Sequence, residues 1–543
     1  MKKIFMTCAV MSCFCAGLHA QDIYKVEMLS GSDLDGDARY VGMGGAMSAL
    51  GANLSAMGTN PASTGLYRRS DVSFTAGLSS QPDGMHLINN ARELGPDKTR
   101  GFVNQAGMVY AIRTGNDTGL KFFNIGFNYK RARNFKQYIG LNGISTPNGL
   151  SQTWQMLDLA QDMDGYWLDL ENEKDRDQTT PLTLLGYDTY LIDPVIKDNT
   201  ITDYLGSAAQ AYNYRRAQWG GIHQYDINFS TNISERFYVG VTMGIYDVSW
   251  HNLLCYDEML LDNQGQHFGN SNMQLEEHMT GVGFDGKVGI IVRPMEESPF
   301  RMGLSVTTPT AYDLETFSNL YLYSPYTDDD HPDGFWGEMD SNNKYRIRTP
   351  WKLNLSAATT VGNFLALDAE YEWQNYSSAA VRYSDSGEYY YDDYYEGGWS
   401  SYSTDLGLQT EIKNWMRNVH TFRLGIEARP SSNFAVRAGY NFVSSPFDKD
   451  AYLNLVITEG PSYYYASNTD YVNLGETHRA TLGLGYSTKY FYIDAAYQHQ
   501  MQEATVYAFH YNDDERSDVK NALEGQQLKL HRNNFQITLG VKF

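Results

Sequence analysis

Side chains suited to covalent chemistry are scarce in this sequence. Of its four cysteines, Cys8, Cys13 and Cys15 lie near the N-terminus, and Cys255 alone stands in the rest of the chain. Neither the Gly-x-Ser-x-Gly turn of serine hydrolases, nor the Gly-x-x-x-x-Gly-Lys-Ser/Thr phosphate loop, nor the His-Glu-x-x-His motif of zinc proteases occurs. We therefore expect that the chain is not an enzyme and needs no cofactor.

Carboxylates and histidines could instead bind a metal ion. Acidic runs stand at residues 328–330, 392–393 and 513–515, and carboxylate oxygens are the ligands that divalent cations prefer. Clustered acids are also typical of the solvated tips of loops, which is the interpretation we favour. The Glu-Glu-His run at residues 276–278 is a second candidate, although such a run is more often the polar end of a strand. The sequence thus requires no metal and leaves cation binding open.

The net charge of −22 limits the partners. Nucleic-acid binding needs a basic face that neutralises phosphates, so an acidic chain predicts no nucleic-acid partner. The composition is rich in Gly (49) and Tyr (42) but poor in Pro (15). This favours tight turns and aromatic-rich strands over domains joined by proline-rich linkers.

The N-terminus has the form of a secretory leader. Lys2 and Lys3 precede an apolar or small run that ends at Ala20. A basic start, a short apolar stretch and a small residue at the cut are typical of a signal peptide, so we expect residues 1–20 to be removed on export. The run is too short for a membrane anchor. Lipidation at Cys13 is a weaker alternative, because the apolar run before it is very short.

Beyond residue 69 the dominant pattern is alternation of apolar and polar residues with a period of two, which indicates strands. The last segment shows it clearly, with Phe535, Ile537, Leu539, Val541 and Phe543 on one face. Fourteen segments carry the pattern, at residues 72–78, 106–112, 123–129, 225–229, 237–245, 282–292, 302–306, 351–357, 365–373, 422–428, 434–442, 480–486, 491–497 and 535–543.

The opposite face of these strands is rich in charge. It includes Arg113, Asp226, Asp285, Lys287, Arg301, Lys352, Asp368, Glu370, Arg423, Glu427, Arg437, Arg479 and Asp494. A soluble sandwich would turn the polar face to water and the apolar face to a core. A membrane barrel would turn the apolar face to lipid and the polar face to its lumen. Alternation alone does not separate the two.

The lengths of the connections favour the barrel. Short links stand near residues 114–119, 232–236, 294–299, 361–363, 430–433 and 487–489, whereas long ones span roughly 80–104, 130–222, 247–280, 309–344, 375–418, 444–476 and 500–533. Short and long links alternate, as in a barrel with short periplasmic turns and long external loops. We therefore predict an all-β fold, a fourteen-stranded antiparallel transmembrane barrel over residues 70–543 in a bacterial outer membrane.

The largest expected loop, residues 130–222, contains features of its own. Residues 150–163 suit a short amphipathic helix, and residues 182–185 and 190–192 are unusually apolar. These apolar runs indicate either a small core within the loop or an apolar landing groove at the barrel mouth. The tyrosines at residues 389–395 would pack on neighbouring loops and meet headgroups, or stack on ligands.

Residues 21–69 do not alternate, and small residues dominate them. Gly42, Gly44 and Gly45 lie in one run, and Asn60-Pro61-Ala62 follows. Glycine permits close approach of backbones, so this segment could pack tightly in a confined space. We predict that it folds back into the lumen as a plug.

These N-terminal motifs resemble the hatch of the FadL-like outer-membrane transporters, in a divergent branch of the kind found in Bacteroidetes-like bacteria. The resemblance covers about residues 36–66 and departs at Ser63-Thr64, since the family usually runs from the triplet straight into Gly-Leu. It implies passive, hatch-gated transport of long-chain fatty acids or other hydrophobic compounds. It also assigns Asn60, Pro61 and Ala62 as hatch determinants, and Gly42, Gly44 and Gly45 as its flexible packing.

The resemblance extends to the C-terminus, where Phe543 ends an amphipathic strand in the manner of the signal read by the barrel assembly machinery. The expected partners are therefore this machinery, a hydrophobic small molecule, and the lipid and lipopolysaccharide of the outer membrane. The charged inner face favours an alternative, a receptor or scaffold barrel of the same superfamily that transports nothing. A diffusion porin is less consistent with a plug.

Overall fold

The computed structural model describes residues 23–81, 99–115, 119–161, 165–384, 402–453, 469–511 and 521–543. The expected leader at residues 1–20, the tyrosine-rich run at 389–395 and the acidic runs at 392–393 and 513–515 lie outside the described residues. The lipidation and headgroup-packing predictions for these segments therefore stay predictions.

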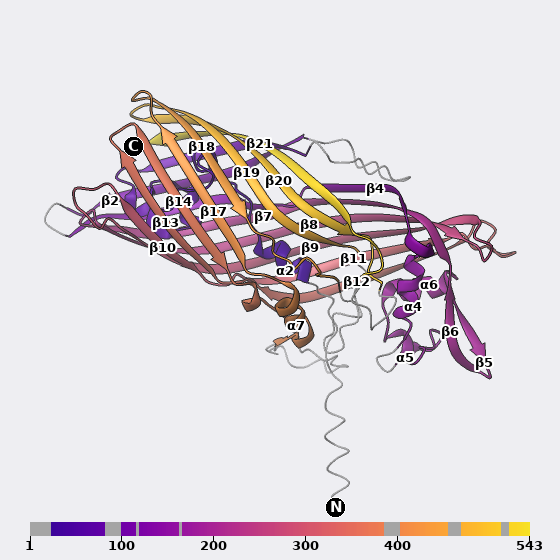
Figure 1. The fold of residues 1–543 in the computed structure, drawn as a ribbon. Coiled ribbons are helices and arrows are strands. Elements are labelled where there is room, and N and C mark those ends of the chain that lie inside the picture. The colour runs from indigo at the N-terminus through magenta and orange to yellow at the C-terminus, as the bar shows by residue number, and fades with distance from the viewer. Residues whose placement is uncertain are drawn as a thin grey trace, which may run out of the picture.

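Antiparallel strands close into a ring (Figure 1). In the described residues the ring follows the order β1 (Asp71–Ser80), β2 (Thr99–Arg113), β3 (Leu120–Asn134), β7 (Ala208–Ile233), β8 (Phe237–Leu261), β9 (His267–Val292), β10 (Arg301–Thr307), β13 (Lys352–Val361), β14 (Leu365–Gln374), β17 (Val419–Ala428), β18 (Phe434–Val443), β19 (Tyr471–Ser487), β20 (Phe491–Tyr507) and β21 (Gln526–Lys542). β21 pairs with β1 and closes the ring. These strands coincide with the predicted segments, so the fourteen-stranded barrel is confirmed.

The short turns occupy one end of the ring. Between β7 and β8, Ser234 and Glu235 both have positive φ angles of 54° and 56°, the conformation of the two-residue hairpin turns that match strand twist. Arg113 is exposed at this same end. It stands where β2 leaves the wall for a turn.

The expected loops at residues 247–280 and 309–344 are wrong as loops. β8 and β9 stay paired up to Leu261 and His267, and β11 (Ala311–Ser324) pairs with β9 and with β12 (Phe335–Arg348). β4 (Gln137–Ser145), β15 (Ala380–Ser384) and β16 (Tyr402–Thr404) also extend the wall. Above the membrane the outward face meets water instead of lipid. It therefore loses the apolar alternation by which the sequence revealed the other strands.

The distribution of polarity across the wall is inverted relative to a soluble protein. Leu482 and Leu484 on the outside are each 62% exposed, whereas Asp226 and Glu427 on the inside are at most 1% exposed. Apolar side chains of this kind surround the ring, and a soluble sandwich would bury them. The wall is therefore a lipid-facing surface around a polar lumen. No helix in the described part of the chain is both long enough and apolar enough to span a membrane.

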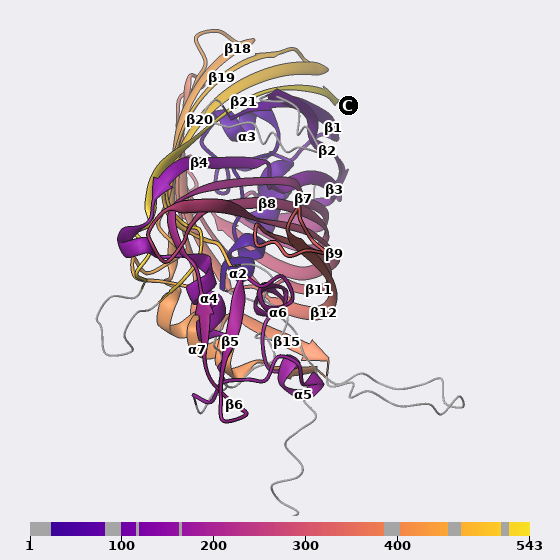
Figure 2. The same cartoon turned by 90° about the vertical axis from the view of Figure 1, so that its right-hand side faces the viewer.

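Residues 23–70, which we call the N-terminal segment, lie within the ring (Figures 1 and 2). The segment contains α2 (Ile23–Ser30), α3 (Ala38–Gly42) and the 3-10 turns η1 (Ser55–Gly58) and η2 (Pro61–Leu66). Most of its residues are buried, including polar Ser48, Ser63 and Thr64. It leads directly into β1.

A layer of short elements covers the end opposite the short turns. It comprises η3 (Pro147–Gly149), α4 (Gln152–Asp158), α5 (Glu173–Arg176), α6 (Pro181–Asp188), β5 (Ile192–Lys197), β6 (Thr200–Gly206), η4 (Tyr376–Ser378) and α7 (Leu406–Trp415). Leu182, Leu185 and Ile192 are buried in one core with Leu254 and Leu275 of the extended strands. The interpretation of the apolar runs as a core is thus confirmed, and the landing groove is wrong because these side chains are covered.

Salt bridges fasten this external layer. Arg417, just after α7, donates from Nε to Oδ2 of Asp448 at 3.1 Å. This hydrogen bond lowers the pKa of the Asp448 carboxyl. Arg176 of α5 pairs with Asp188 at the end of α6 at 2.8 Å. Such exposed pairs orient the layer but contribute little stability.

Candidate functional site

The candidate site is the lumen, and its shape is set by the way the N-terminal segment contacts the wall. The Asn60-Pro61-Ala62 triplet lies against β7 to β10. Asn60 caps η2 by accepting a hydrogen bond from the Ala62 amide at 3.0 Å, and Asn228 donates to the Pro61 carbonyl at 3.1 Å. A Cβ placed at Gly240 of β8 would lie 2.4 Å from the Pro61 carbonyl. The wall therefore admits the triplet only because glycine stands there.

The glycine run of the segment contacts the wall at β17 to β19. Gly44 and Gly45 have φ angles of +65° and +83°, which L side chains rarely adopt. A Cβ at Gly44 would lie 2.7 Å from the Tyr440 amide nitrogen, and one at Gly42 would lie 3.1 Å from Cα of Gly483. These glycines serve close backbone contact, and the two predicted motifs occupy two separate stretches of wall. Their gating roles stay predictions.

Inward carboxylates of β14 hold the backbone between these two contacts. Glu370 accepts hydrogen bonds from the amides of Met47 (2.7 Å) and Ser48 (2.6 Å), and Asp368 accepts one from Leu50 (2.9 Å). Both carboxylates are at most 4% exposed. Side chains of the wall thus take the place of the strand partners that this irregular segment does not have.

Ion pairs provide a second set of anchors. Arg39 of α3 donates from Nε to Glu427 of β17 at 2.8 Å, and Arg437 of β18 reaches the same carboxylate at 2.7 Å. Asp35 pairs with Arg131 of β3 at 2.8 Å. The charges that the sequence places on the inner face therefore serve in part to fix the N-terminal segment.

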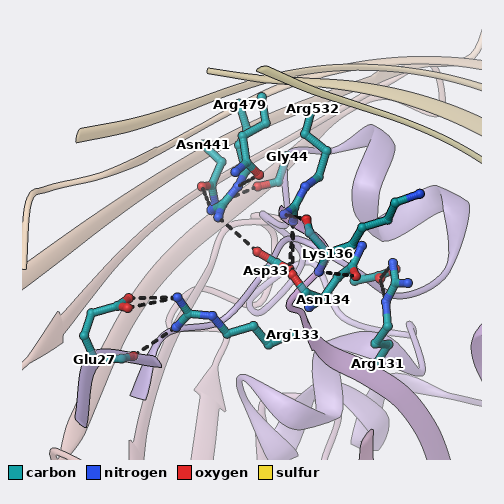
Figure 3. Close-up of polar contacts among 12 residues, drawn as sticks. Glu27, Asp33, Gly44, Arg131, Arg133, Asn134, Lys136, Asn441, Arg479 and Arg532 are labelled. Carbon is teal, nitrogen blue, oxygen red and sulfur yellow. Dashed lines mark hydrogen bonds and ion pairs between the residues drawn. The ribbon is translucent and has the colours of Figure 1, made fainter. Parts of the chain in front are cut away.

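Asp33 lies at the centre of an arginine cluster (Figure 3). Its carboxylate is 3.4 Å from Nη1 of Arg532 and 3.7 Å from Nη2 of Arg479, and it accepts the Asn134 amide hydrogen at 2.8 Å. Arg133 in the same view turns to Glu27 of α2, with both N–O distances at 3.0 Å. One carboxylate faces two guanidinium groups here, so the cluster keeps a surplus of positive charge.

The arginine cluster lines a cavity of about 260 Å³ between α2 and the wall. The charged side chains around it are basic Lys25, Lys130, Arg133, Arg216, Lys287, Lys352, Arg423, Arg479 and Arg532 and acidic Glu27, Asp33, Asp285, Glu372 and Asp470. Apolar and aromatic side chains cover another part of the lining, among them Met28, Tyr246, Trp250, Tyr312 and Phe447. The cavity is therefore amphipathic, with an excess of basic groups.

Two of the lysines form no close ion pair with any described residue. Lys352 donates to the Ser30 carbonyl at 3.1 Å, and within the described residues neither Lys352 nor Lys130 comes within ion-pair distance of a carboxylate. Their charges, unlike that of Arg39, are compensated only at longer range, by Asp226 for Lys130 and by Glu372 for Lys352. A negatively charged group in the cavity would complete their pairing.

The second metal candidate, the Glu-Glu-His run, does not come together. Glu277 points inward to Lys25 at 3.3 Å, whereas His278 is exposed and stacks on His251 with ring centroids 4.2 Å apart. Successive residues of β9 face opposite sides of the wall, so the three side chains do not converge. No cluster of three or more His, Cys, Asp or Glu suited to a metal occurs in the described part of the chain.

Sequence reasoning missed the acidic residues of the N-terminal segment. Glu27, Asp33 and Asp35 precede the glycine and Asn-Pro-Ala motifs, and those motifs alone indicated a plug. A usable signal was present, because acids in a segment expected to enter a polar lumen should meet the inward arginines. Phe543, the expected assembly signal, is 62% exposed and donates its amide hydrogen to the Ser70 carbonyl at 3.0 Å.

Sequence comparisons return nothing: no model of a protein family and no curated protein matches the chain. Among solved structures, a FadL homologue from Pseudomonas aeruginosa matches with a TM-score of 0.50 and 15% identity, over 94% of this chain and 99% of that one. The fold is that of the FadL family. Together with the lipid-facing belt, this FadL-type fold places the chain in an outer membrane, as the sequence predicts.

Two further FadL-type structures are the toluene transporters TodX of Pseudomonas putida and TbuX of Ralstonia pickettii. TodX matches with a TM-score of 0.45 and 12% identity, over 97% of this chain and 100% of that one. TbuX matches with a TM-score of 0.43 and 12% identity, over 94% of this chain and 99% of that one.

Proposed function

We propose that the chain carries hydrophobic small molecules passively across the outer membrane, with the N-terminal segment as a hatch. The supporting observation is the way in which the lumen is filled. The segment is held by side-chain hydrogen bonds, ion pairs and glycine contacts, and it adds no strand to the wall. It can therefore rearrange while every strand pairing of the barrel is kept.

Long-chain fatty acids are the substrate class that the cavity fits best. Apolar side chains such as Met28, Trp250 and Phe447 would contact the hydrocarbon, at about 0.8 kcal/mol per buried methylene. Lys130 and Lys352 would take the carboxylate, which supplies the missing negative charge. An uncharged hydrocarbon would leave those two lysines unpaired, so the cavity favours an acid over a neutral compound.

The first experiment measures uptake. Cells that lack the gene and cells that express the chain are given a labelled long-chain fatty acid and, separately, the corresponding neutral alcohol. The proposal predicts faster uptake of the acid with the chain present, and a smaller gain for the alcohol. Equal uptake of both compounds with and without the chain would refute transport.

A second experiment tests gating by a disulfide between the hatch and the wall. A Cβ at Gly42 would lie 3.6 Å from Cβ of Arg437, within the range for a disulfide. With Cys255 replaced by serine, we expect oxidised G42C/R437C to block uptake and a reductant to restore it. R437C alone is the matched control, since it loses the same arginine without forming the bridge. Unchanged uptake in the oxidised double variant would show that uptake does not require the hatch to move away from the wall at this contact.

A receptor or scaffold barrel remains the second candidate, and the external layer favours it. Strands β8, β9, β11 and β12 rise well past the lipid-facing belt and carry a core of their own. Transport does not require such a structure, whereas a binding platform does. If cells that express the correctly folded chain take up the labelled compounds no faster than cells without it, the result would support a receptor or scaffold function.

A further inference from the structure

A group of basic side chains lies on the outside of the barrel. Lys344, Arg346 and Arg348 alternate along β12, and Arg382 of β15 is the cross-strand partner of Arg346. Tyr345, between two of them, is fully buried towards the lumen. Because successive residues of a strand point to opposite faces, the four basic side chains face outward. We call these four residues the rim patch.

The strand register places the rim patch at the upper edge of the lipid-facing belt. Ala311 of β11 pairs with Arg348 on one side and with Phe284 on the other, and the Phe284 side chain is 53% exposed. Trp351, 46% exposed, follows Arg348 by three residues. Basic and aromatic side chains at the end of an apolar belt are typical of the level of lipid headgroups.

Two arginines of the rim patch form no ion pair with any described residue. Arg346 donates from Nε to Asp313 at 3.0 Å and stacks on Tyr402, with its guanidinium carbon 3.6 Å from the ring centroid. By contrast, no carboxylate in the described ranges lies within ion-pair distance of Arg348 or Arg382. The patch therefore keeps a surplus of positive charge, in a chain whose net charge is −22.

We propose that the rim patch binds the phosphate of a phosphorylated glycolipid in the outer leaflet. Arg348 and Arg382 are the phosphate ligands, and Arg346 is held beside them by Asp313. The planar guanidinium group matches phosphate oxygens in pairs, which explains arginine at these positions. The acyl chains of the glycolipid lie against the apolar belt directly below and hold the phosphate at this height. Free phosphate has no such anchor, so the occupant is a lipid.

The test measures lipid retention by the purified full-length chain in detergent, using native mass spectrometry. The probes are bisphosphorylated lipid A and the same lipid without its phosphates. We expect the bisphosphorylated form to bind about tenfold or more tightly, and R348Q/R382Q to reduce it to the level of the dephosphorylated form. Equal retention of the two lipids by the native chain would overturn the proposal.

Lys529→Gln is the matched control, because Lys529 is an exposed basic residue of β21 on another part of the barrel. Lys529→Gln should leave lipid retention unchanged. A loss of retention as large as that of R348Q/R382Q would show that any lost positive charge weakens lipid binding, and it would overturn the proposed site. Millimolar inorganic phosphate should not displace the lipid, and displacement would overturn the lipid assignment. If R348Q/R382Q does not fold, R348K/R382K keeps the charge but not the planar fork. The R348K/R382K variant should then bind bisphosphorylated lipid A several-fold more weakly than the native chain does. Unchanged binding would contradict the roles given to the two arginines.

Discussion

Single carboxylates organise the lumen, and their partners come from distant parts of the chain. Asp33 meets Arg479 and Arg532, and Glu370 takes two backbone amides of the N-terminal segment. Each carboxylate is buried or nearly so, where an uncompensated charge is costly. The position of the segment therefore depends on a few acidic groups more than on its length.

Replacing Asp33 by asparagine tests this dependence. Asp33→Asn leaves Arg479 and Arg532 facing each other without a carboxylate, so we expect the free energy of unfolding to fall by about 2–4 kcal/mol. Urea unfolding of the refolded barrel measures this loss of stability. Asp188→Asn breaks the exposed pair with Arg176 and should cost no more than about 1 kcal/mol. Equal effects of the two variants would contradict the role of Asp33.

At the scale of elements, glycine decides where the N-terminal segment and the strands can touch. Gly44 combines a left-handed backbone with contact to the backbone of β17 and β18. Gly240 of β8 likewise leaves room for the Asn-Pro-Ala triplet, because a Cβ there would lie 2.4 Å from the Pro61 carbonyl. An irregular segment can follow the wall closely only where one of the two partners lacks a side chain.

Gly44→Ala should therefore be strongly destabilising. The left-handed conformation costs an alanine about 1–2 kcal/mol, and the Cβ contact at 2.7 Å with the Tyr440 nitrogen adds overpacking. We expect a loss of about 2–4 kcal/mol in the same urea experiment. Gly101→Ala is the control, since its nearest contact would be an ordinary 3.6 Å from Leu78. If the Gly44→Ala barrel is as stable as the Gly101→Ala barrel, the N-terminal segment can shift to accommodate the added methyl group at little cost in free energy.

The external layer forms a separate element with its own core. Leu275 of β9 is fully buried there, above the lipid-facing belt. Leu275→Ala should remove about 2–5 kcal/mol from this core and speed proteolysis within residues 165–206, while the barrel keeps its heat-modifiable migration on gels. Ile196→Ala, at a side chain 65% exposed, should leave proteolysis unchanged. Loss of heat-modifiable migration in Leu275→Ala would instead make the layer part of the barrel's own cooperative unit.

At the scale of the whole molecule, the inside and outside of the wall have exchanged their usual polarity. The same degree of exposure therefore has different meanings along the chain. Leu482 of β19 and Leu205 of β6 are both 62% exposed, the first within the lipid-facing belt and the second in the external layer. Lipid surrounds one and water the other.

Arginine at these two positions should separate the two environments. Leu482→Arg places a charge in the hydrocarbon and should cost about 2–4 kcal/mol when the barrel is folded into lipid vesicles. Leu205→Arg should change stability by less than about 0.5 kcal/mol, as at an ordinary surface. Equal costs at the two sites would contradict the membrane position of the belt.

The sequence by itself determined the fourteen strands that cross the membrane and the short turns between them. Both are local signals: alternation with a period of two needs only a few consecutive residues, and lipid on one side keeps that alternation clean. The inner charges could be placed on one face for the same reason, from Asp226 to Asp494. The small-residue character of the N-terminal segment likewise predicted a tightly packed plug.

Only the tertiary structure decided which charges meet. Asp33 and Arg532 are far apart in sequence, and their contact depends on how the strands are offset around the closed ring, which no local pattern encodes. It also extended β8, β9, β11 and β12 past the membrane, where water on the outside removes the apolar alternation. The rim patch follows from the same register, because strand pairing alone brings Arg382 beside Arg346 at the height where lipid ends.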